Sequence, residues 1–201
     1  MKNSLLQKYI EMLRKEGMQT LTKRSRDWFI DLAMGGTLKG SFKKLVNDPN
    51  VKTRTNPMIG KMYFFKYDPK YKTTLPYYDR YPLIILADRP KKGKGFYGMN
   101  LHYLSPLDRA KLLGAMYPTL STTGKELKPS TRLRISYGIL KAASRFRLFK
   151  PTFKRYLPDH IKSQIVEIPA EFWEIAMFMP TQKFVGSTVS TVWSESRKKG
   201  R

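Results

Sequence analysis

Cysteine is absent from the 201-residue sequence, which excludes disulfide bonds and thiolate metal sites. Histidine is nearly absent as well. The two histidines, His102 and His160, lie far apart, and neither has a second ligand residue at metal-binding spacing. We therefore expect neither a metal ion nor another cofactor.

Long apolar runs are also missing. No stretch approaches the ~18 consecutive apolar residues that a membrane-spanning helix needs, so we expect no membrane partner. The first sixteen residues are amphipathic, but they include Glu11 and Glu16, and no small-residue cleavage site follows a long apolar stretch. This pattern predicts that the chain carries no secretory signal.

Acidic residues are scarce. The chain has 15 Asp and Glu against 39 Lys and Arg, a net charge of +24, while 41% of its residues are hydrophobic and can form a core. A compact domain with this charge repels itself, and a polyanion relieves the repulsion. Nucleic acid is the commonest such partner, because neutralised phosphates release counterions. Anionic membrane and merely solubilising charge are the alternatives.

Helical periodicity dominates the N-terminal part. Apolar residues repeat at helical spacing over residues 5–13, and Gly17 ends that pattern. A second helix is predicted over residues 23–34, ending at Gly35. Residues 37–57 are polar and basic and indicate a loop or arm.

The middle of the chain changes to strand-like segments. We predict strands over residues 61–67, 81–88, 96–103 and 165–168, the second and third joined as a hairpin by the turn 89–95. Their aromatic faces predict an α+β fold, in which a small SH3-like curved antiparallel sheet or partial barrel is wrapped by several helices.

The remaining segments complete this architecture. Ser105 and Pro106 predict a helix start, as N-cap and first-turn proline. Further helices are predicted over residues 131–146, 170–179 and 188–199. We divide the chain into N-terminal helices with a basic arm (1–58), an α+β core domain (59–185) and a C-terminal helix with a basic tail (186–201).

One interval is purely basic: no acidic residue falls between Glu126 and Asp159. On the predicted helix 131–146, basic side chains share one face beside an apolar stripe, and Arg binds phosphate through two hydrogen bonds. The interval predicts contacts to a phosphate backbone, the alternative being an ordinary solvated face. The candidates are Arg132, Arg134, Lys141, Arg145, Arg147, Lys150, Lys154 and Arg155.

A second basic cluster lies in the hairpin turn Arg-Pro-Lys-Lys-Gly-Lys-Gly, whose glycines would let the backbone approach phosphate. The alternative is an ordinary turn with solubilising lysines. The candidates are Arg89, Lys91, Lys92 and Lys94, and the terminal Arg-Lys-Lys-Gly-Arg is predicted to add nonspecific attraction from a flexible tail. Tyr71, Tyr77 and Tyr78 could stack on unpaired bases, although packing against the sheet edge is the favoured interpretation.

The carboxylates do not form the pattern of an enzyme. Asp68, Asp79 and Asp88 border strands without the grouping that holds a nuclease metal. The glycine-rich segment 35–40 lacks P-loop spacing and follows a helix. We expect the protein not to be an enzyme.

Several motifs resemble a family of small proteins encoded by T4-like tailed bacteriophages. They are Tyr-Asp-Pro at residue 67, Leu-Pro-Tyr-Tyr-Asp at residue 75, Asn-Leu-His-Tyr-Leu at residue 100 and Val-Trp-Ser-Glu-Ser at residue 192. The similar regions are residues 60–115 and the last fifteen. The resemblance implies a phage protein that is associated with the virion or with DNA, and it supports the expectation that the protein is not an enzyme.

These observations favour a virion-associated, largely sequence-nonspecific DNA-binding protein that contacts phosphate backbone or DNA ends. Its task would be end protection, packaging, or a function in the portal and neck region. Double-stranded DNA is the favoured partner, together with other virion proteins, and the expected location is the virion and the host cytoplasm during infection. The alternatives are a structural virion component that docks on acidic subunits, a factor that binds RNA or single strands, and a nuclease.

Overall fold

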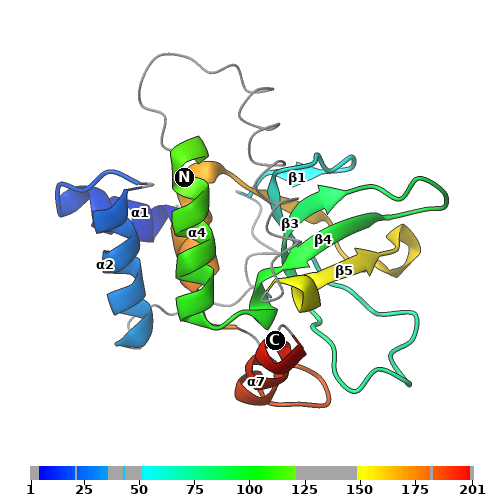
Figure 1. Cartoon of the computed structure of the whole chain (residues 1–201). Coiled ribbons are helices and arrows are strands. Elements are labelled where there is room, and N and C mark those ends of the chain that lie inside the picture. The colour runs from blue at the N-terminus through cyan, green and yellow to red at the C-terminus, as the bar shows by residue number, and fades with distance from the viewer. Residues whose placement is uncertain are drawn as a thin grey trace.

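The computed structural model describes residues 5–20, 22–35, 43, 51–120, 149–181 and 183–199. Its centre is an antiparallel six-stranded sheet in the order β1-β6-β2-β3-β4-β5 (Figure 1). The strands are β1 (Thr53–Arg54), β2 (Met62–Phe64), β3 (Leu83–Asp88), β4 (Phe96–Asn100), β5 (Phe153–Tyr156) and β6 (Ile165–Ile168).

Helices gather on one side of this sheet in Figure 1. They bury the main core against alternate strand residues, among them Met62, Leu83 and Met99. The helix α7 lies apart from this layer, at one end of the sheet (Figure 1). The helices of the described residues are α1 (Leu5–Lys15), α2 (Lys23–Met34), α4 (Pro106–Leu120), α6 (Trp173–Phe178) and α7 (Val189–Lys199), with short 3₁₀ turns η1 (Leu101–Tyr103), η2 (Lys150–Thr152), η3 (Pro158–His160) and η4 (Ala170–Phe172).

The other face of the sheet carries its own aromatic cluster. Strand residues that alternate with those of the main core place Tyr63, Phe65 and Phe96 on this face. Tyr67 and Tyr156 join the cluster, with ring centroids 5.0 Å apart in an edge-to-face arrangement. Both faces of the sheet are therefore apolar. Because β3 is buried on both faces, its sequence is an almost continuous run of hydrophobic residues.

The predicted α+β class is confirmed, and each predicted strand corresponds to an observed one. Two short strands, β1 and β5, lie at the two edges of the sheet and were not predicted. The sheet is therefore open, and its two edge strands, β1 and β5, do not pair with each other. The SH3-like likeness and the three-part division of the chain stay predictions.

Gly95 allows β5 to pair with β4. Its φ is +103°, in the left-handed region, and a Cβ there would lie 2.2 Å from the carbonyl oxygen of Tyr156. A side chain at this position would collide with the neighbouring backbone, so glycine is needed for the strands to meet.

A buried arginine joins the helical layer to η1. Arg109, 1% exposed, donates from Nε to the carbonyl oxygens of Leu101 and Leu104, both at 2.9 Å. Its Nη1 donates to Met177 O at 2.8 Å, and its Nη2 to the hydroxyl of Thr181. Burial disfavours the charged form of the Arg109 guanidinium and lowers its pKa. The four hydrogen bonds to oxygen acceptors offset part of the free-energy cost of burying this charge.

Candidate nucleic-acid interface

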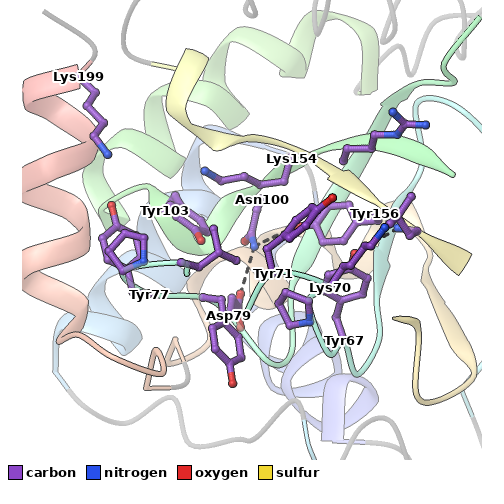
Figure 2. A pocket seen from close by; sticks show the side chains of 16 residues that line it. Tyr67, Lys70, Tyr71, Tyr77, Asp79, Asn100, Tyr103, Lys154, Tyr156 and Lys199 are labelled. Atoms are coloured by element: carbon purple, nitrogen blue, oxygen red, sulfur yellow. Dashed lines mark hydrogen bonds between the residues drawn. The ribbon is translucent and has the colours of Figure 1, made fainter. Parts of the chain in front are cut away.

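A pocket of about 630 Å³ opens at the end of the sheet that carries β5 and α7. Its walls come from four segments that are far apart in sequence: the loop 67–79 between β2 and β3, the junction of β4 with η1, β5, and the end of α7 (Figure 2). Tertiary folding alone brings these segments together.

The walls of the pocket are rich in tyrosine. Tyr67 and Tyr156 form one part of the wall, and Tyr77 and Tyr103 form another (Figure 2). The ring centroids of Tyr77 and Tyr103 lie 6.1 Å apart. Tyr103 also packs edge-to-face on Phe184, at 5.1 Å, which holds its ring in place. By contrast, Tyr71 on the loop is 62% exposed and presents its ring to solvent.

Asp79 anchors the floor of the pocket. Its Oδ2 contacts the Nδ1 of His102 at 2.7 Å and accepts a hydrogen bond from the Asn100 amide at 3.2 Å. Its Oδ1 accepts from the backbone N–H of Tyr81 at 2.9 Å. The same Asn100 amide donates to the hydroxyl of Tyr156 at 3.2 Å. These contacts hold the Asp79 carboxyl group at a fixed buried position.

The rim, in contrast, is cationic. Lys70, Lys154, Arg155 and Lys199 line the pocket, and within the described ranges none of the four forms an ion pair with a carboxylate. Arg155 donates to a backbone oxygen, that of Lys94, at 3.0 Å. Positive charge that is not neutralised beside a pocket attracts an anion.

Lys154 is the most constrained of these cations. Its Nζ lies 4.5 Å from the centre of the Tyr103 ring, a cation–π contact. Burial lowers the pKa of Lys154, and the neighbouring charge of Lys199 lowers it further. A bound anion would screen the repulsion between the two ammonium groups and raise the pKa of Lys154.

This arrangement predicts that binding of a polyanion takes up protons in alkaline buffer. In the free protein the pKa of Lys154 lies below its ordinary value of 10.5, so this side chain loses its proton at a lower pH than an exposed lysine does. A bound anion would raise this pKa, and Lys154 would keep its proton in the complex. The affinity should therefore fall as pH rises through the lowered pKa. Calorimetry in buffers of different ionisation enthalpy measures the uptake, and Lys154→Gln should reduce it. Equal uptake by both proteins would contradict the assignment to Lys154.

Side-chain contacts of α7 fix the position of Lys199. The indole N–H of Trp193 donates to His102 O at 2.9 Å, and Arg197 Nη2 donates to Ser105 Oγ at 2.9 Å. Burial raises the pKa of Tyr77 to about 12, and a hydrogen bond with Glu195 raises it too. The helix predicted over residues 188–199 is confirmed by α7, whose last turn includes Arg197, Lys198 and Lys199. These three residues of the terminal basic segment are therefore helical and do not belong to a flexible tail.

The structure brings two of the predicted basic clusters together. Arg155 on β5 reaches the backbone of Lys94 in the hairpin turn, next to Gly93. Lys91, Lys92 and Lys94 are exposed in that turn. Arg89 has a structural contact instead, because its Nη2 donates to Asn56 Oδ1 and Pro57 O, both at 2.8 Å.

Of the interval without acidic residues, 127–158, the described residues include only the C-terminal part from residue 149 onward. Lys150 is exposed in η2, and Lys154 and Arg155 lie on the edge strand β5. Arg132, Arg134, Lys141, Arg145 and Arg147, with the helix predicted over residues 131–146, lie outside the described residues.

Several pocket residues were not identified from the sequence as candidates. Tyr67, Tyr103 and Tyr156 had no distinguishing pattern, and Asp79 was interpreted as part of a turn. The tyrosines predicted as stacking candidates differ in their surroundings. Tyr71 is exposed, whereas Tyr77 packs on Tyr103. The sequence signals that pointed here were the basic interval, which supplied Lys154 and Arg155, and the tyrosines of the loop, Tyr71, Tyr77 and Tyr78.

The described residues contain no group of three or more His, Asp or Glu side chains placed to hold a metal ion. Across these same ranges, every helix is too short or too polar to cross a bilayer. Comparison with curated proteins found no match. Comparison with solved structures found none either.

The comparison with protein families did give a match. The family model described as the phage T4 terminal DNA protecting protein matches residues 1–196, nearly the whole chain. This confirms the T4-like phage resemblance inferred from four short motifs and extends it to regions that the motifs do not cover. The chain belongs to the family of the phage T4 terminal DNA protecting protein.

Proposed function

We propose that this protein binds the ends of double-stranded phage DNA and shields them from exonucleases. The family supports DNA ends as the target. The observation that carries the proposal is the cationic rim, where Lys154 on β5 and Lys199 on α7 line one pocket and, among the described residues, form no ion pair with a carboxylate. Two ammonium groups on one pocket repel each other. Phosphates at a DNA end would relieve this repulsion.

The binding mode follows from the kinds of side chain present. Lysines and arginines contact phosphate oxygens, which are the same in every sequence, so binding is largely independent of base sequence. The exposed lysines of the β3–β4 turn lie next to Arg155 and extend the cationic surface beyond the pocket. Arg132, Arg134, Lys141, Arg145 and Arg147 remain predicted backbone contacts.

Protection in this proposal needs no catalysis. A bound protein occupies the terminus that an exonuclease must engage, so its residence time at the end decides the degree of protection. We propose that the protein acts in the virion and, after DNA entry, in the host cytoplasm. Contacts with other virion proteins and a position near the portal and neck belong to the same proposal.

Preference for an open end tests the proposal. Two short duplexes of equal length are compared at physiological salt, one closed by hairpin loops at both ends and one with a single open end. We expect the open end to bind about tenfold more tightly or better, since it adds specific contacts to nonspecific attraction. Digestion of the open duplex by a double-strand exonuclease should slow accordingly.

Equal affinity for the two duplexes would contradict end binding, because a chain of net charge +24 attracts any DNA. Affinity that survives only at low salt, without protection from the exonuclease, would instead favour a structural virion component. Digestion of either duplex by the protein itself with added Mg²⁺ or Mn²⁺ would contradict the absence of catalysis.

A further inference from the structure

The tyrosine-lined pocket has a size and a chemistry that interior duplex DNA cannot use. Its volume of about 630 Å³ lies in the range of sites for single small ligands, and it is too small to take in a duplex. A DNA end differs from the interior because its last base can leave the stack with only one neighbour lost. The pocket therefore suits one nucleotide of an end, an inference that rests on the proposed function.

The walls supply surfaces for an unpaired base. Aromatic side chains stack on any base through its π-face, which keeps binding independent of sequence. Tyr71 offers an exposed ring across the opening from Tyr103 and Tyr77, as Figure 2 shows. Edge-to-face contacts fix Tyr67 against Tyr156, so this wall is preformed.

The charges give the nucleotide a direction. The buried carboxylate of Asp79 lies at the floor and repels phosphate, whereas the lysines lie at the rim. Figure 2 shows the side chains of Lys154 and Lys199 extending toward the end of the pocket formed by Tyr77 and Tyr103. A base directed inward and a phosphate held at the rim match this separation of charge.

We propose that this pocket holds the unpaired terminal nucleotide of a DNA end, with its base against Tyr71 and its phosphate between Lys154 and Lys199. The open end is then recognised by a group that a closed or interior duplex does not offer. Because the terminal pair must separate before its base can enter, an end that is already unpaired binds more tightly than a blunt one.

The test uses the full-length protein and duplexes with one open end. That end is blunt, carries a single-nucleotide overhang on either strand, or carries the same overhang without its base. We expect one nucleotide overhang to bind about tenfold more tightly than its abasic counterpart, which keeps the phosphate and loses only the stacking.

Variants assign this difference to the pocket. Tyr71→Ala should remove the tenfold gap between nucleotide and abasic overhangs, and Tyr71→Phe should keep it, since only the ring is needed. Tyr71 is 62% exposed, so neither change disturbs the core. Lys8→Gln, an exposed lysine on α1, is the control outside the pocket and should leave the gap unchanged.

Two results would overturn the inference: equal binding of nucleotide and abasic overhangs by the unaltered protein, or an unchanged gap in Tyr71→Ala. Displacement of DNA by free deoxyadenosine monophosphate at equal molar concentration would also overturn it, because the pocket would then be a site for free nucleotides. If open ends still bind better than closed ones in these cases, the proposed function stands and the inference alone fails.

Discussion

Arg109→Ala is expected to destabilise the protein by about 3–5 kcal/mol, the cost of breaking a buried charged network by removing one partner. Three backbone carbonyl groups, of Leu101, Leu104 and Met177, would lose their donor in a dry interior. The loss also leaves a cavity, because the side chain is among the largest that are fully buried. Urea denaturation followed by circular dichroism measures the change.

Arg197→Ala is the matched control for this variant. Its guanidinium is half exposed and contacts the buried side chains of Asp108 and Ser105 in the same region. We expect a loss of about 1 kcal/mol, because the Arg197 side chain is half exposed and Asp108 keeps the hydrogen bond from Ser105. If Arg109→Ala cost no more than this control, the four hydrogen bonds of Arg109 would not be a main connection between η1, α4 and α6.

The double variant Lys154→Glu, Lys199→Glu is expected to weaken binding to an open DNA end by about 100-fold or more, since each reversal replaces a phosphate contact with repulsion. The plot of log affinity against log salt should become shallower by about 2, one for each lost phosphate contact. Fluorescence anisotropy across a salt series measures both quantities.

General charge loss must be separated from loss of the site. Lys8→Glu, Lys23→Glu makes the same two charge reversals on exposed positions of α1 and α2. Its effect should be several-fold smaller and similar for open and closed duplexes. An equal effect of the two double variants would mean that total charge, and not the rim of the pocket, decides the affinity. Near-native circular dichroism is required of both proteins.

Local pattern was sufficient for the helices and the central strands. Apolar residues at helical spacing predicted α1 and α2, and hydrophobic runs predicted β2, β3, β4 and β6 near their observed positions. Burial decides these elements, and burial leaves a period in the sequence. The strand β5 escaped prediction because two of its four residues, Lys154 and Arg155, are cations, and its strand conformation depends on pairing with β4.

The sequence by itself determined the excess of positive charge, the absence of thiol chemistry and the α+β class, because each depends on composition or on short periods. Only the tertiary structure decided where an anion could be held. Tyr71, Lys154 and Lys199 come from a loop, an edge strand and the last turn of a helix, and no spacing relates them. Chain folding juxtaposes these side chains through the sheet order and the docking of α7, which are long-range contacts that a local pattern does not encode.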